Sequence, residues 1–165
     1  MAVCRVMVQC VGIFAFLSVY GLTLSMKAQY HEYEFTGHEA TLFVLKRYVK
    51  LVLSFTLPFL FCMGVTYLTH TSRYSDGFPI NLINAGMDFL GLGHLFGTQM
   101  QINTWWYLSL EILLIFFMPF LVRFYKRYGW LMVFMFLLIG SFMLEKHVHL
   151  TKYLLVAPLA VCFAD

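Results

Sequence analysis

Long apolar runs separated by short charged segments dominate the pattern of this chain. The first run, residues 6–26, holds no charged residue and lies between Arg5 and Lys27. As an α-helix rising about 1.5 Å per residue, it is long enough to cross the roughly 30 Å of hydrocarbon in a bilayer. A signal peptide is the alternative, but its shorter apolar core and small-residue cleavage site match this run poorly. We therefore predict a first membrane span here.

Four further runs follow the first. The predicted second span covers residues 51–68 and contains Pro58, and the third covers residues 105–122. The fourth, residues 129–144, is short for a span, so we expect flanking residues to extend its helix. A fifth run begins near Tyr153 and is cut off at Asp165 before it could cross.

Residues 78–104 differ from these runs, because glycines interrupt them and they contain Asp88 and His94. Interrupted backbone is tolerated at membrane depth only where protein or water satisfies its polar groups. The pattern therefore favours a short interfacial helix or a re-entrant segment over a span.

Composition restricts the chain to the class of membrane proteins. Of its 165 residues, 61% are hydrophobic and only 12% are charged, whereas about a quarter of the residues of soluble domains are charged. The net charge of +3 is small and its basic residues fall in short clusters, so we expect no nucleic-acid partner. We predict an all-α, polytopic bundle in a single membrane domain over residues 1–165, with about four full spans plus a truncated fifth.

Basic residues between the runs indicate the orientation of the chain, because cytoplasmic loops retain Lys and Arg. The segments 27–50 and 123–128, predicted as loops, hold seven of them. The other side holds four, namely Arg5, Arg73, Lys146 and Lys152. This bias places Met1 outside and both loops in the cytoplasm. With Met1 outside the membrane, we expect that a helix preceding the first span is missing from this sequence.

One carboxylate, Glu111, interrupts the third run. An ionisable side chain inside a span costs several kcal/mol unless it is in its neutral form, paired with another group or facing water. Counted from Trp105, Glu111 lies roughly 9 Å below the start of the helix, in the outer part of the bilayer. Two interpretations stay open from the residues alone: a hydrogen bond to a neighbouring helix, or a role in a functional site.

The residues around Glu111 form a recognisable motif. Trp106, Leu108, Ser109 and Glu111 spell W-x-L-S-x-E. This resembles a motif of the acyltransferase 3 family, bacterial integral membrane enzymes that move acyl groups onto cell-surface carbohydrates and lipids.

Two further stretches resemble the same family in the same order. Residues 14–25, FAFLSVYGLTLS, resemble its F-x-F-L-S-G-Y-G-L stretch, and residues 45–59, LKRYVKLVLSFTLPF, resemble its basic start of the next helix. In two places the chain departs from the family. Val19 stands where the family usually has Gly, and no helix before it carries the Arg and His that are the family's hallmark. The resemblance therefore implies a piece that begins at the family's second span and stops before its last.

The resemblance implies O-acylation, such as acetyl transfer from an acyl-CoA donor to a hydroxyl of a cell-surface carbohydrate or lipid-linked sugar, at the bacterial plasma membrane. It also implies that Ser18, Ser109 and Trp106 donate hydrogen bonds to the developing oxyanion, and that Glu111 orients the base or binds the sugar. Because the family's His is the natural base, we expect the chain to be inactive when taken alone.

The basic cluster Lys46, Arg47 and Lys50 stands before the second span. Such clusters attract anionic lipid headgroups at the cytoplasmic face. A cytoplasmic acyl-CoA donor also needs cations for its phosphates, and the family resemblance implies that these three residues bind it.

Other clusters favour plainer explanations. His31, Glu34 and His38 could share a helical face and imitate a metal site, but a solvated helix explains them better. The four cysteines show neither disulfide nor metal spacing, so we expect no bound metal. Two other functions stay open: a transporter or channel subunit that uses Glu111 as a proton or cation site, and a non-functional remnant of a truncated gene.

Overall fold

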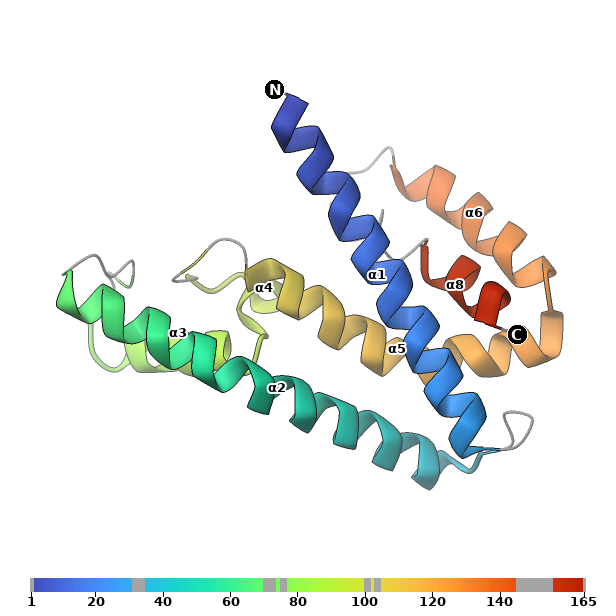
Figure 1. Ribbon diagram of the computed structural model, residues 1–165, viewed down its shortest axis with the longest axis horizontal. Coiled ribbons are helices and arrows are strands. Elements are labelled where there is room, and N and C mark those ends of the chain that lie inside the picture. The colour runs from blue at the N-terminus through green and yellow to red at the C-terminus, as the bar shows by residue number, and fades with distance from the viewer. Residues whose placement is uncertain are drawn as a thin grey trace. The chain divides into compact units, whose positions relative to one another are not determined.

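The computed structural model describes residues 2–30, 35–69, 74, 77–99, 102, 105–144 and 156–164. Every regular element in these ranges is an α-helix (Figure 1), as predicted. The chain divides into two compact units. Unit 1 comprises Met1–Thr41 and Leu113–Asp165, and unit 2 comprises Leu42–Ile112.

Three helices are long and apolar enough to cross a membrane, which indicates a membrane protein. The first is Cys10–Gln29 within α1 (Ala2–Gln29). The others are α2 (Gly37–Leu68) and α5 (Trp106–Tyr128). They correspond to the first three predicted spans.

The two remaining apolar runs form shorter helices. The helix α6 (Leu131–Leu144) has 14 residues, or about 21 Å, which is less than the hydrocarbon thickness. The predicted count of four full spans is therefore not confirmed. The fifth run contains α8 (Val156–Ala164), while Tyr153, its predicted start, lies outside the described residues.

In unit 1, α1 packs against α8 (Figure 1). The buried face of α1 carries Ala15, Val19, Leu22 and Met26, which recur every three or four residues and so form one stripe. The buried residues of α8 include Ala157, Ala160 and Ala164. Small side chains of this kind allow two membrane helices to approach closely.

A second contact in unit 1 joins two segments that the sequence places on the same side of the membrane. Arg123, near the end of α5, donates a hydrogen bond to the carbonyl oxygen of Phe35 at 3.1 Å. Its guanidinium also lies 4.8 Å from the centre of the Phe35 ring. Phe35 belongs to the connection between α1 and α2, so this connection lies beside the last turns of α5. The orientation of the chain in the membrane stays a prediction. Among the residues assigned to the opposite side, Arg73, Lys146 and Lys152 lie outside the described part of the chain.

The predicted loop over residues 27–50 is wrong at both ends, because α1 continues to Gln29 and α2 begins at Gly37. Thr36 and Glu39 form a capping box. The Thr36 N–H donates to Oε2 of Glu39 at 2.7 Å, and the Glu39 N–H donates to the Thr36 hydroxyl at 3.4 Å. The basic cluster therefore lies on a helix, and so do the residues 123–128, which are the last turns of α5. His31 and Glu34 lie outside the described residues.

Unit 2 contains most of α2, the short helices α3 (Ile80–Phe89) and α4 (Gly93–Phe96), and the first turns of α5. The predicted short helix in residues 78–104 is thus present, whereas its place at the membrane interface stays a prediction. Aromatic rings connect these elements. The ring of Phe59 on α2 lies 5.3 Å from that of Phe89 on α3 and 5.5 Å from that of Trp105 before α5.

Candidate functional site

The turn between α3 and α4, formed by Leu90 and Gly91, lies very close to α5 in unit 2. Gly91 has a left-handed backbone, with φ of +71°. A Cβ atom added to it would lie 2.6 Å from the side chain of Ile112 and 2.7 Å from that of Leu108. Only glycine combines this φ with this closeness at little cost.

Two hydroxyl groups bind the carbonyl oxygens of this turn. The Ser109 hydroxyl of α5 donates to the Gly91 carbonyl at 2.5 Å, and the Tyr48 hydroxyl of α2 donates to the Leu90 carbonyl at 3.2 Å. Backbone outside a helix needs hydrogen-bond partners for its polar groups. One hydroxyl from each of two candidate spans provides such a partner for these two carbonyls, and the bond from Ser109 is buried.

This turn brings together two stretches that the sequence separately singled out. Tyr48 lies on α2 within the basic cluster Lys46, Arg47 and Lys50, and Ser109 belongs to the W-x-L-S-x-E motif of α5. Both hydroxyls bond to adjacent carbonyls, so the two stretches meet although they are far apart in the chain. We call this region, comprising the Leu90–Gly91 turn with the parts of α2 and α5 that contact it, the turn site.

Glu111 lies two residues after Ser109 and is half-buried. The hydroxyl of Tyr107, one helical turn earlier, forms a hydrogen bond with its carboxylate. The carboxylate thus has a partner on its own helix, which helps to hold it in one orientation.

The other residues that the sequence assigned to the site differ in their surroundings. Ser109 is 1% exposed and its hydroxyl binds Gly91, so in this structure it positions the turn. Trp106 is half-buried in the first turn of α5. Ser18 is half-buried on α1, in the other unit. The oxyanion roles of these three residues stay predictions.

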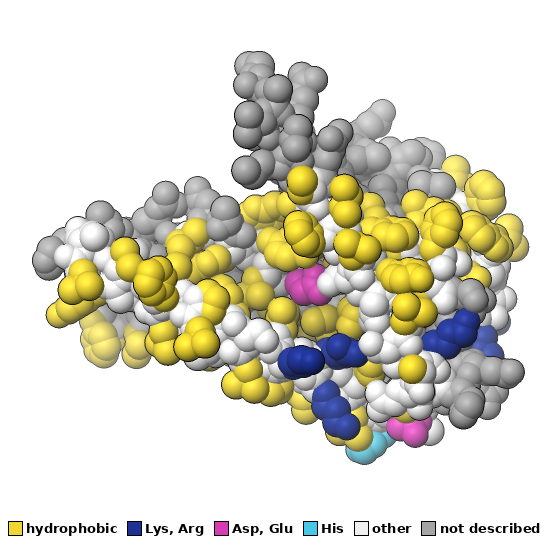
Figure 2. Space-filling view, viewed as in Figure 1, with side chains coloured by type: hydrophobic (Ala, Val, Ile, Leu, Met, Phe, Trp, Pro, Cys, Tyr) yellow, Lys and Arg dark blue, Asp and Glu magenta, His cyan; other side chains and the backbone are white. Residues whose placement is uncertain are grey.

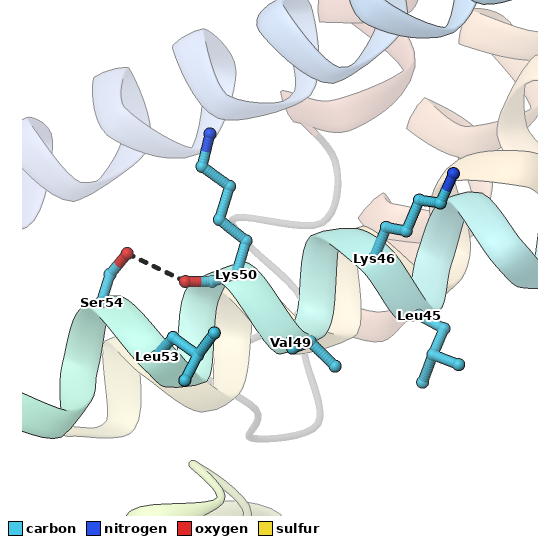
Figure 3. Close-up of a pocket in the computed structure, with 6 residues that line it drawn as sticks. All are labelled: Leu45, Lys46, Val49, Lys50, Leu53 and Ser54. Atoms are coloured by element: carbon cyan, nitrogen blue, oxygen red, sulfur yellow. Dashed lines mark hydrogen bonds between the residues drawn. The ribbon is translucent and has the colours of Figure 1, made fainter.

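The three cations of α2 also differ from one another. Lys46 and Lys50 are exposed and extend from the same side of the helix (Figure 3). The Arg47 guanidinium lies instead over the ring of Phe43, 5.5 Å from its centre. Figure 2 shows basic side chains gathered where α2 runs across this face of the molecule.

A buried polar cluster on α3 was missed in the sequence. Asp88 is 2% exposed and accepts a hydrogen bond from the Tyr74 hydroxyl at 2.6 Å. The Asn81 side chain donates to the Tyr74 carbonyl at 3.3 Å. Burial, followed by this bond to Asp88, raises the pKa of Tyr74 above its usual value. Asn84, also buried, stands one helical turn before Asp88. Two polar residues four positions apart lie on one helical face, and this spacing could have indicated the cluster from the sequence.

No protein-family profile, curated protein or solved structure matches this chain. A role in acyl transfer is therefore a proposal that rests on the motifs of the sequence and on the geometry of the turn site.

Proposed function

We propose that this chain takes part in transferring an acyl group, such as acetyl, from acyl-CoA to a hydroxyl of a cell-surface carbohydrate at the bacterial plasma membrane. The observation that carries the proposal is the turn site, where Tyr48 of α2 and Ser109 of α5 bind adjacent carbonyls. These residues belong to two of the stretches that resemble acyltransferase 3 enzymes. Their meeting at one turn is what a shared site requires.

The chemistry requires a group that orients the acceptor or its base, and donors for the oxyanion that develops at the thioester carbonyl. We assign the first task to Glu111, which is half-buried and hydrogen-bonded by Tyr107. The indole N–H of Trp106 is our candidate oxyanion donor. Ser109 acts through the Gly91 carbonyl, by fixing the turn against α5.

For the donor, we assign the phosphates of acyl-CoA first to Arg47. A guanidinium can bind a phosphate through two parallel N–H groups, which a lysine ammonium cannot do. Lys46 and Lys50, which the sequence assigned with it, line a separate hollow on the same helix.

The Glu111→Gln variant, introduced into the native gene, tests the proposal. We expect the O-acetyl content of the cell-surface carbohydrate, measured by mass spectrometry, to fall by about tenfold or more, a typical effect of losing a group that acts in proton transfer or orientation. Glu39→Gln is the matched control, because glutamine also serves in the capping box. With equal amounts of protein in the membrane, an unchanged O-acetyl content in Glu111→Gln would overturn the proposal.

The donor assignment has its own test. Arg47→Gln should raise the apparent KM for acyl-CoA several-fold with little change in kcat, because the interaction binds the donor in the ground state as well as in the transition state. An unchanged KM would remove Arg47 from the donor site without touching the role of Glu111.

A further inference from the structure

The short helix α3 has one polar face and one apolar face. With 3.6 residues per turn, Asn81, Asn84 and Asp88 share one side of the helix, and Leu82 and Ile83 lie on the opposite side. We call the first three residues the polar face and the other two the apolar face. In such an amphipathic helix, the face that is exposed indicates which surroundings the helix suits.

The polar face of α3 points inward and the apolar face points outward. Asn84 and Asp88 are 5% and 2% exposed, whereas Leu82 and Ile83 are 65% and 59% exposed. A helix on the surface of a soluble protein has the opposite arrangement, because burying apolar side chains is favourable and burying polar ones is costly. The observed arrangement therefore favours apolar surroundings for α3.

Hydrogen bonds hold α3 in this orientation. The Tyr74 hydroxyl donates to the Asp88 carboxylate at 2.6 Å, and the Asn81 side chain donates to the Tyr74 carbonyl at 3.3 Å. A rotation of α3 that buried its apolar face would break both bonds. The apolar face is therefore exposed because the polar face is bound inside unit 2.

The neighbouring helix α2 indicates what the apolar surroundings are. The ring of Phe89 on α3 lies 5.3 Å from the ring of Phe59 on α2. Phe59 is in the middle of the uncharged stretch 51–68, which belongs to a candidate membrane span. Leu57 is 77% exposed and lies about 200° around α2 from Phe59, so α2 presents apolar side chains on the side away from α3.

The apolar face of α3 and the exposed side of α2 thus lie on different sides of α2. Figure 2 shows hydrophobic side chains along the second half of α2. One partner helix would cover only one of these two surfaces, whereas the hydrocarbon of a bilayer covers both.

We propose that the apolar face of α3 contacts the hydrocarbon chains of membrane lipids. With ten residues, or about 15 Å, α3 is too short to cross the membrane, so it enters the bilayer beside α2 without spanning it. Non-helical backbone at membrane depth requires partners, and the turn after α3 has them in the hydroxyls of Tyr48 and Ser109. The inference goes beyond the proposed function, because it holds whether or not the chain transfers acyl groups.

Spin labelling of the full chain in phosphatidylcholine liposomes tests the inference. In a variant without the native cysteines, Ile83→Cys carries a nitroxide label, and electron paramagnetic resonance measures how often the label collides with oxygen and with a water-soluble nickel complex. Oxygen is concentrated in the hydrocarbon of the bilayer, whereas the nickel complex stays in water. Leu82→Cys provides a second label on the same face and should give the same result.

Two matched positions calibrate the measurement. Leu57→Cys places the label on the exposed side of a candidate span, and Lys126→Cys places it at an exposed position near the end of α5. The ratio of oxygen to nickel collisions at Ile83 should be several-fold higher than at Lys126 and similar to the ratio at Leu57.

Two results would overturn the inference. A ratio at Ile83 as low as at Lys126 would place the apolar face in water. Few collisions with either reagent would mean that protein, such as a second copy of this chain, covers the face instead of lipid. Neither result bears on Glu111 in the proposed function.

Discussion

At the scale of single residues, the turn site depends on the close approach of Gly91 to α5. Gly91→Ala should destabilise the protein by about 2–4 kcal/mol, because alanine disfavours the left-handed backbone and its Cβ would overlap Leu108 and Ile112. Thermal or denaturant unfolding in detergent, followed by circular dichroism, measures the change.

Gly97 provides the matched control for this substitution. It has a similar left-handed backbone, with φ of +65°, but a Cβ there would meet nothing within 4 Å. Gly97→Ala should therefore cost only the backbone term, about 1–2 kcal/mol. Equal losses in the two variants would mean that the turn does not pack tightly against α5.

The Tyr74–Asp88 bond predicts a dependence of stability on pH. Because its pKa is raised in the folded state, Tyr74 contributes stability that is fully present below its unfolded pKa of about 10 and is lost as the pH rises further. The protein should therefore lose more thermal stability between about pH 9 and pH 11 than the Tyr74→Phe variant does. Equal losses of thermal stability in the two proteins would show that the Tyr74–Asp88 bond does not contribute to this pH dependence.

The sequence could identify polar residues in apolar surroundings, but not their partners. Glu111 and Ser109 stood out because a carboxylate and a motif interrupted an apolar run. The bond from Ser109 to Gly91 could not be predicted, since it depends on how a turn from a different part of the chain packs on α5. Tyr48 was missed for the same reason.

At the scale of elements, the start of α2 depends on its capping box. Thr36→Ala should destabilise the protein by about 1 kcal/mol, because the Glu39 N–H loses its hydroxyl partner. Thr41→Ala is the control, since the exposed Thr41 hydroxyl only bonds back to the Gly37 carbonyl within the helix. Its cost should stay within about 0.5 kcal/mol. Unfolding of both variants in detergent measures the difference, and equal costs would show that the cap is not needed.

The apolar runs predicted which helices exist, but not where they end. A run of apolar residues marks the part of a helix that lipid can cover, whereas capping and the absence of helix breakers decide its length. The sequence Thr36-Gly37-His38-Glu39 contained the capping signal for α2, and the charged residues beyond it concealed the helix. The same reasoning explains why α5 continues through Arg123 to Tyr128.

At the scale of the whole molecule, the orientation makes a testable prediction. With α1 entering from outside, the segment around Phe78 lies outside and the end of α5 lies in the cytoplasm. In a variant without the native cysteines, Cys introduced for Phe78 should react with an impermeant maleimide on intact cells. Cys introduced for Lys126 should react only after the cells are permeabilised. The reverse labelling pattern would show that the chain has the opposite orientation.

The fold class was predictable at this scale, because most of the chain falls in apolar runs of helical length. The number of full spans was not, since α6 is intermediate in length and its neighbours decide how such a helix lies. The family resemblance rests on short motifs, so the function inferred from it needs a direct assay.

Acyl transfer in native membranes tests the proposed function, because such membranes also contain the other components that the reaction needs. Membranes from cells with and without this chain are given radiolabelled acetyl-CoA, and label in the carbohydrate fraction is counted. We expect incorporation that depends on the chain and is lost in Glu111→Gln. Equal incorporation with and without the chain would contradict the proposed function.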